Sequence, residues 1–172
     1  MKNLLRQTSS FIAPVLFCIV LPYFLVAGRE RPSIFSATIP LAILGALICL
    51  GGLVIFILTV RMIILIGNGT IMPWDPSRRL VTGSLYGYVR NPMILSLIVI
   101  EIGEALLFDT IWLALLALVF YLINTVYFRR SEEPGLEKRF GQEYEEYKRN
   151  VPRWIPRLKP WNPGQTGRRS SE

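Results

Sequence analysis

The stretch Arg78–Ile94, RRLVTGSLYGYVRNPMI, is a polar connection with glycine and tyrosine between two strongly apolar segments, and the rest of the chain is organised around it. It ends in Arg90-Asn91-Pro92, where a proline opens the next apolar run. Proline fits the first turn of a helix and disfavours helical backbone in the preceding residue, so we expect Asn91 at the start of a helix. Such a start has unpaired N–H groups and the positive end of the helix dipole, which favours a polar ligand. A basic loop that merely begins a membrane helix has the same pattern.

The composition is that of a membrane protein. The chain has 172 residues, 52% hydrophobic, with a mean hydropathy of +0.42 and a net charge of +7. An ordinary soluble domain is less apolar. Histidine is absent from the sequence, and the two cysteines, Cys18 and Cys49, lie inside apolar runs. We therefore expect no metal site, no iron–sulfur cluster and no disulfide scaffold, and we expect both thiols to pack as small side chains.

Four apolar segments predict an all-α integral membrane fold in a single membrane domain over residues 1–172. They cover residues 11–27, 39–66, 93–108 and 111–128. Each approaches or exceeds the ~20 residues that cross a ~30 Å hydrocarbon core. The first lacks a small-residue cleavage site, so we interpret it as a mature span rather than a signal peptide.

Two local patterns predict how these helices pack. Gly45, Cys49 and Gly52 lie on one helical face, which permits close helix contact. The very short turn Phe108–Thr110 predicts that the third and fourth spans form an antiparallel hairpin.

The charge distribution predicts the orientation. Of the 19 Lys and Arg residues, only Arg29 and Arg31 lie between the first two spans, and none lies in the Phe108–Thr110 turn. Positive charge marks the cytoplasmic side, so we expect both termini, the loop 67–92 and the tail 129–172 to be cytoplasmic. We expect a multi-pass protein of the inner membrane if the source is bacterial, or of the endoplasmic reticulum if it is eukaryotic, without a nucleic-acid partner. The oligomeric state is left open.

The tail begins with a predicted amphipathic helix from Glu132 to Val151. Its apolar residues recur at steps of three and four, and they are Leu136, Phe140, Tyr144, Tyr147 and Val151. Ser131 is a candidate N-cap, and Pro134 fits only near the start of the helix. A helix that lies at the membrane interface, with arginines reaching to lipid headgroups, is the alternative interpretation. Loop and tail are too short for a βαβ nucleotide-binding domain, so any cofactor must lie between them and the helix ends.

Three polar side chains lie within the predicted spans. Glu101 and Glu104 share one helix face, where a carboxylate is costly and is a candidate functional group by default. Glu104 is close to the far turn, so we expect a structural role for it, whereas Glu101 is an open candidate for a proton acceptor. Asn124 is expected to join helices or to line a site.

Two motifs together resemble one known family. The loop LVTGSLYGYVRNPM, with EEPGLEKRFGQEYEEYKRNVPRWIP after the last span, resembles the isoprenylcysteine carboxyl methyltransferases, which are related to the membrane phospholipid methyltransferases. The resemblance covers roughly residues 78–156. It implies an integral-membrane methyltransferase that uses S-adenosylmethionine, held between the loop, the cytoplasmic end of the hairpin and the tail.

The resemblance also implies site residues. The cofactor-binding positions that it implies are Arg79, Leu80, Val81, Tyr86, Asn91, Pro92, Met93, Ile94, Glu132 and Glu133. The family's substrate-binding arginine falls near Phe128 in this register, so Arg129 or Arg130 is the candidate here. Asn91 replaces the usual histidine, Ser84-Leu85 replaces a common Gly-Pro, and Ile94 replaces a frequent tyrosine. No imidazole base is therefore present at position 91.

Transfer from a sulfonium methyl donor suits a site with few catalytic groups. The methyl group is already activated, so the protein must mainly position the nucleophile in line. We predict that Asn91 binds polar edges of the cofactor, that Glu132 accepts from its hydroxyl or amino groups, and that Arg129 binds an anionic group. We expect the acceptor to be a membrane lipid or another lipid-soluble or small molecule, similar to an isoprenylcysteine carboxylate or a phospholipid. A membrane reductase that uses NADPH and a non-enzymatic membrane module are the alternatives.

Overall fold

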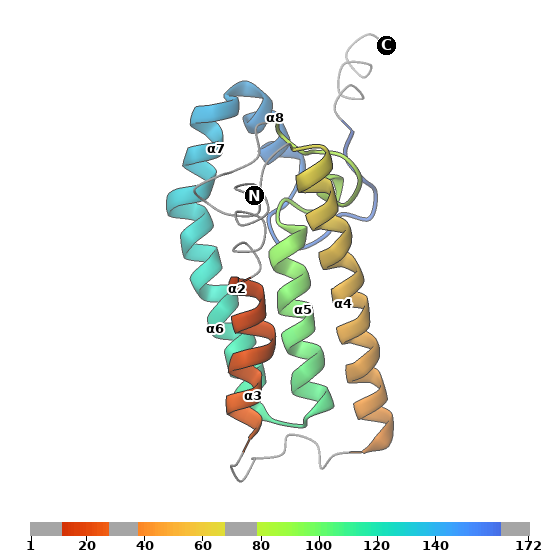
Figure 1. Cartoon of the computed structure of the whole chain (residues 1–172). Coiled ribbons are helices and arrows are strands. Elements are labelled where there is room, and N and C mark those ends of the chain that lie inside the picture. The colour runs from red at the N-terminus through yellow and green to blue at the C-terminus, as the bar shows by residue number, and fades with distance from the viewer. Residues whose placement is uncertain (1–11, 28–37, 68–78, 163–172) are drawn as a thin grey trace, which may run out of the picture.

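The computed structural model describes residues 12–27, 38–67 and 79–162 (Figure 1). All regular structure in these ranges is helical, and no strand occurs in them. The elements are α2 (Ile12–Val15), η1 (Leu16–Val20), α3 (Leu21–Val26), α4 (Ile39–Leu65), η2 (Ser84–Gly87), α5 (Pro92–Leu107), α6 (Ile111–Tyr127), η3 (Phe128–Glu132), α7 (Glu133–Phe140) and α8 (Gln142–Asn150). The start of the first predicted span, Arg29, Arg31, part of the loop and both chain ends lie outside the described residues.

Within the described ranges, two helices are long and apolar enough to cross a membrane, judged by length and composition. They are Ile39–Leu65, with a hydropathy of 2.9, and a continuous helix from Ile111 to Phe140, with a hydropathy of 2.1. The all-helical fold class is thus confirmed. Four membrane crossings stay a prediction, because α5 has only 16 residues and the N-terminal helix formed by α2, η1 and α3 is also short.

The helices form a bundle with α5 at its centre (Figure 1). Helix α5 contacts α4, α6 and the N-terminal helix. The buried core lies between α4, α5 and α6 and consists of Phe56, Val60, Leu97, Ile98 and Phe120. Large apolar side chains such as Leu47, Leu50 and Val119 are exposed on the outside of the bundle, as expected for surfaces that face lipid.

Close packing of α4 on α5 confirms the predicted small-residue face. A Cβ atom at Gly45 would lie 2.6 Å from the backbone nitrogen of Leu107, and one at Gly103 would lie 2.6 Å from Cys49 Sγ. The Cys49 thiol donates to the carbonyl of Ile100 over 3.5 Å. The two backbones therefore touch at positions where no larger side chain fits.

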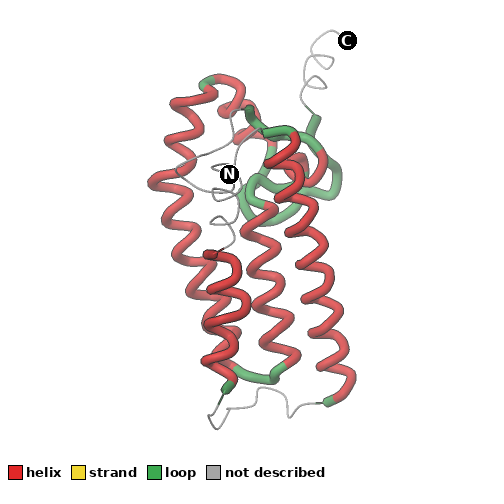
Figure 2. The backbone as a smooth tube through the Cα atoms, viewed as in Figure 1, coloured by secondary structure: helices red, strands yellow, loops and turns green. Residues whose placement is uncertain are grey.

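The hairpin of α5 and α6 also forms as predicted. Asp109 adopts a positive φ of 46°, and the Thr110 N–H donates to the Ala105 carbonyl over 3.2 Å. This turn lies at the end of the bundle opposite α7 and α8 (Figure 1). Figure 2 shows that most of the described non-helical chain gathers at the other end, around α8.

The predicted separate tail helix from Glu132 to Val151 is wrong in two respects. First, α6 runs without a break through the π-helical turn η3 into α7, and the Glu133 N–H donates to the Phe128 carbonyl, so Ser131 caps nothing. The wider turn accommodates Pro134, whose ring would clash with the preceding turn of an uninterrupted α-helix. Second, Gly141 ends α7 with a φ of +53°, and α8 folds back. Glycine is the residue that adopts this backbone without strain.

Candidate functional site

The loop and the tail are joined along their backbones at the polar end of the bundle. The Arg90 N–H donates to the Pro152 carbonyl, and the N–H groups of Arg157 and Trp161 donate to the carbonyls of Tyr88 and Gly87, each over 2.9 Å. A Cβ atom at Gly87 would lie 2.8 Å from the Trp161 carbonyl oxygen, so the two segments approach too closely for a side chain there. We call residues 79–91 and 151–162, together with α7 and α8, the loop–tail junction.

An aromatic cluster fills the junction. Its buried members are Tyr144, Tyr147, Val151 and Trp161, with Leu80, Leu136 and Phe140 packed against them. The Tyr147 hydroxyl donates to the Tyr86 carbonyl over 2.7 Å. The apolar stripe of the tail therefore faces the loop.

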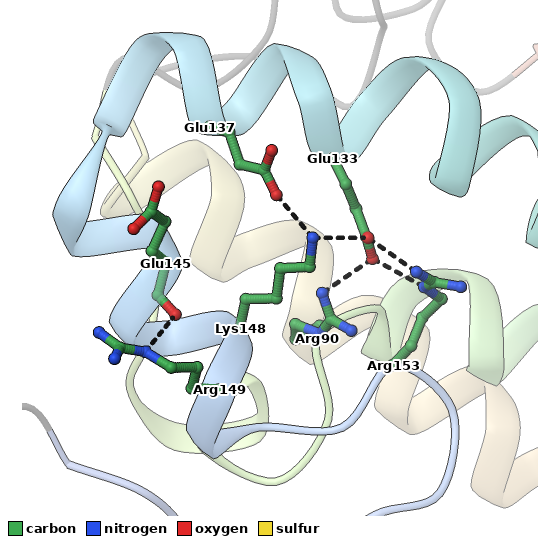
Figure 3. A network of polar contacts seen from close by, with 7 residues as sticks. All are labelled: Arg90, Glu133, Glu137, Glu145, Lys148, Arg149 and Arg153. Atoms are coloured by element: carbon green, nitrogen blue, oxygen red, sulfur yellow. Dashed lines mark hydrogen bonds and ion pairs between the residues drawn. The ribbon is translucent and has the colours of Figure 1, made fainter.

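Glu133 is the centre of an ion-pair cluster that ties four parts of the junction together (Figure 3). Arg90 Nη1 of the loop donates to Glu133 Oε1 over 2.8 Å. Arg153 donates through Nε to Oε1 and through Nη2 to Oε2, each over 2.7 Å. Lys148 Nζ of α8 lies 3.7 Å from Oε2 and bonds Glu137 Oε1 at 2.6 Å.

The electrostatics of Glu133 indicate a structural role. Burial alone would raise the pKa of Glu133, but the hydrogen bonds from Arg153 and the charges of Arg90, Arg153 and Lys148 outweigh it and lower the pKa. Both carboxylate oxygens already accept hydrogen bonds from arginines. Cofactor binding by Glu133 stays a prediction, and the geometry leaves it little capacity for a ligand.

Glu132 differs from its neighbour in each of these properties. It forms no ion pair with another residue of the described ranges. Burial raises the pKa of Glu132 to about 7, helped by the charge of Glu133 and opposed by that of Arg139. Burial and the nearby Glu132 charge in turn raise the pKa of Tyr86, so these two predicted site residues are neighbours. Glu132 is thus a carboxylate that is free to accept from a ligand.

The other predicted site residues lie at the start of α5, in the loop before it and in η3. Asn91 is the N-cap residue, its side chain makes no capping bond, and buried Pro92 follows in the first turn. Met93 and Ile94 pack against the core of the bundle, and Val81 is buried. Arg79, Arg129 and Arg130 are exposed.

Glu101 lies apart from these residues. It is fully buried in α5, where the Cys18 thiol of the N-terminal helix lies beside its carboxylate. Nine residues separate it from Pro92, which is about 14 Å along a helix at ~1.5 Å per residue. Buried Leu97 and Ile98 occupy the intervening turns. The structure therefore does not bring Glu101 together with Asn91 and Arg129. Asn124 donates to the Phe120 carbonyl of its own helix over 2.8 Å.

Trp154 is a candidate site residue that the sequence interpretation missed. Its ring lies 5.3 Å from that of Tyr121 and 5.9 Å from that of Phe128, centroid to centroid. The buried donors Trp154 Nε1 and Arg90 Nε have no hydrogen-bond partner in the described part of the chain. A tryptophan in an otherwise polar tail segment was the available signal, because so large an apolar ring is usually buried.

The junction offers complementary groups to S-adenosylmethionine. An unpaired carboxylate, Glu132, suits the ammonium or hydroxyl groups of such a ligand, and the unpaired donors of Arg90 and Trp154 suit a carboxylate. No group of three or more His, Cys, Asp or Glu side chains with the spacing of a metal site occurs in the residues that the structure describes.

The structure is a helical bundle with an apolar outside and a polar end. The comparison with known families identifies its class as a membrane methyltransferase. The phospholipid methyltransferase family matches residues 40–143, and the chain belongs to that family. The match confirms the expected relation to these enzymes, while membership among the isoprenylcysteine carboxyl methyltransferases stays a prediction. No curated protein and no solved structure matches the chain.

Proposed function

We propose that the chain is an S-adenosylmethionine-dependent methyltransferase that acts on a lipid-soluble acceptor, of the phospholipid or of the isoprenylcysteine type. The observation that carries the proposal is the unpaired Glu132 carboxylate beside the loop, in a chain of the phospholipid methyltransferase family. The family assignment favours methyl transfer over the reductase alternative.

In this proposal the junction binds the cofactor and the membrane side supplies the acceptor. Glu132 accepts from hydroxyl or ammonium groups of the cofactor, and Tyr86, Val81 and Asn91 line the same end of the bundle. The bound cofactor supplies an activated methyl group. The chain then needs only to hold the acceptor nucleophile in line and to exclude water, which suits a site without histidine.

Arg129 and Arg130 are exposed and lie in η3, the turn that continues α6. We assign these two arginines to the anionic part of the acceptor, since a guanidinium forms bidentate hydrogen bonds with phosphate and carboxylate. The proposed topology places the junction, the loop and the tail on the cytoplasmic side, in accordance with the distribution of basic residues.

A calorimetric titration of the detergent-purified protein tests the function. We expect S-adenosylmethionine and S-adenosylhomocysteine to bind and NADPH not to bind, and we expect transfer of an isotopically labelled methyl group into the lipid fraction of supplied membranes. Binding of NADPH without binding of S-adenosylhomocysteine would instead support the reductase. Failure of all three ligands to bind would support the non-enzymatic module.

A further inference from the structure

Three buried donors in the loop–tail junction have no hydrogen-bond partner in the described residues, and one of them, Trp161 Nε1, belongs to the aromatic cluster. The other two are the indole nitrogen Trp154 Nε1 and the guanidinium nitrogen Arg90 Nε, and both are shielded from solvent. Buried N–H groups are nearly always paired, because an unpaired one loses its hydration without compensation. Two such groups in one small region call for a ligand or an ordered water.

Both donors belong to the same part of the junction. The Arg90 N–H donates to the Pro152 carbonyl over 2.9 Å, two residues before Trp154. Arg90 and Arg153 also share one oxygen of Glu133, at 2.8 and 2.7 Å. The loop and the Trp154 segment are therefore held together by backbone and side-chain bonds.

The two unpaired groups suit an anionic acceptor because both are donors. Arg90, Arg153 and Lys148 bring three positive charges to the two carboxylates of Glu133 and Glu137. Indole and guanidinium groups donate hydrogen bonds and accept none. Glu133 is already bonded by both arginines, and another polar neighbour of Arg90 is the Tyr144 hydroxyl, while Arg90 Nε and Trp154 Nε1 stay unpaired in the described residues.

We propose that Trp154 Nε1 and Arg90 Nε form a subsite for the anionic oxygen of a ligand in the methyl-transfer reaction, an inference that rests on the proposed function. The oxygen belongs either to the carboxylate of S-adenosylmethionine or to the phosphate of a lipid acceptor. The Trp154 ring packs on Tyr121 and Phe128, where the bundle meets its polar end. A cofactor bound in the junction and the headgroup of a membrane lipid can both reach this position.

The test removes the indole N–H and keeps an aromatic ring at position 154. In one variant Trp154→Phe is made, and in a second the tryptophan is replaced site-specifically by benzothienylalanine, in which sulfur takes the place of the N–H group. Trp112→Phe, at an exposed position on α6, is the matched control. Binding is measured by calorimetry for S-adenosylhomocysteine, for methylthioadenosine, which lacks the carboxylate, and for alkyl phosphoethanolamine against alkylamine. Thermal unfolding is followed in parallel.

If the oxygen is the cofactor carboxylate, both variants bind S-adenosylhomocysteine about tenfold or more weakly and bind methylthioadenosine normally. If it is the lipid phosphate, the same loss falls on alkyl phosphoethanolamine and spares alkylamine and S-adenosylhomocysteine. Unchanged affinity for every ligand overturns the subsite. An equal loss for all ligands also overturns it, because Trp154 then only supports the fold. A wild-type protein that binds none of the ligands refutes the proposed function itself.

Discussion

The Tyr147 hydroxyl donates to the backbone carbonyl of Tyr86 over 2.7 Å, and this bond joins α8 to the short helix η2 of the loop. The two residues are 61 positions apart in the sequence. Both flank the place where Glu132 approaches the loop, so the bond sets the distance between the tail and the predicted cofactor-binding strip.

Tyr147→Phe removes this bond while keeping the ring in the aromatic cluster. We expect a loss of about 1–3 kcal/mol in the free energy of unfolding, since a buried carbonyl is left unpaired. Hydrogen exchange in residues 79–91 should become faster. Chemical denaturation in detergent and exchange mass spectrometry measure the two effects. Tyr23→Phe, at an exposed ring on α3, should change neither, and equal effects of both variants would show that the bond is unimportant.

Glu133→Gln should be the most damaging single change in the junction. It leaves the partly buried side chains of Arg90 and Arg153 without their counter-charge, and the cost should approach the about 3–5 kcal/mol of breaking a buried pair. The side chain of Glu137 is 35% exposed and forms an exposed ion pair with Lys148, so Glu137→Gln should cost less than ~1 kcal/mol. Urea unfolding of both variants gives the comparison. A similar small cost for both would mean that the Glu133 cluster adds little to stability.

The junction should open in acid because of Glu133. Its pKa is lowered in the folded protein, so its contribution to stability is complete above the ordinary carboxyl value of 4.5 and is lost as the pH falls through the lower folded value. We expect tail fluorescence to report this opening in the wild type. The transition should be missing in Glu133→Gln, and a transition that persists there would assign it to other carboxyl groups.

The contribution of Glu132 to folding stability has the opposite pH dependence. Its pKa is raised from 4.5 to about 7, so its contribution to folding stability is complete below 4.5 and is lost as the pH rises through about 7. Binding of a ligand cation or hydroxyl requires the charged form, so affinity for S-adenosylhomocysteine should rise between about pH 6 and about pH 8, on either side of that pKa.

The variant Glu132→Gln tests this directly. At the upper pH it should bind S-adenosylhomocysteine about ten- to a hundredfold more weakly, because a hydrogen bond to a charged group is lost, and its affinity should no longer depend on pH. Glu104→Gln, close to the far turn, should leave affinity unchanged. Binding isotherms in one detergent decide the matter. If Glu104→Gln abolished binding and Glu132→Gln did not, the site would lie at the other end of the bundle.

Two glycines of α4 allow a matched test of helix packing. Gly45→Ala should destabilise by about 1–3 kcal/mol, because backbone atoms of α5 occupy the place of the new methyl group. A Cβ atom at Gly51 would meet no atom within 4 Å, so Gly51→Ala should be neutral or stabilising through helix propensity alone. Thermal unfolding of the two variants measures the difference. Equal melting temperatures would contradict the close contact.

The sequence predicted features that depend on local spacing. The small-residue face of α4, the tight turn at Asp109 and the helix start at Asn91 follow from neighbouring residues, and all three are present. The ion-pair cluster could not be predicted, since Arg90 and Arg153 are distant in sequence and meet only through the fold. The prediction of a separate tail helix is wrong because Pro134, which is typical of a helix start, lies instead after a widened turn inside a continuous helix.

That widened turn determines which of two adjacent glutamates faces inward. A π-helical turn contains one residue more than an α-helical turn, so η3 changes the angular phase of everything after Phe128 by about 100°, the rotation per residue of an α-helix. Without the extra residue, α7 would present another side to Arg90 and Arg153, and Glu133 would turn away from them. Deleting one residue between Arg129 and Ser131 should therefore disconnect the tail from the loop while leaving the membrane helices intact. The number of residues in this one turn thus fixes the rotation of α7 about its axis, and with it the contacts at the polar end of the molecule.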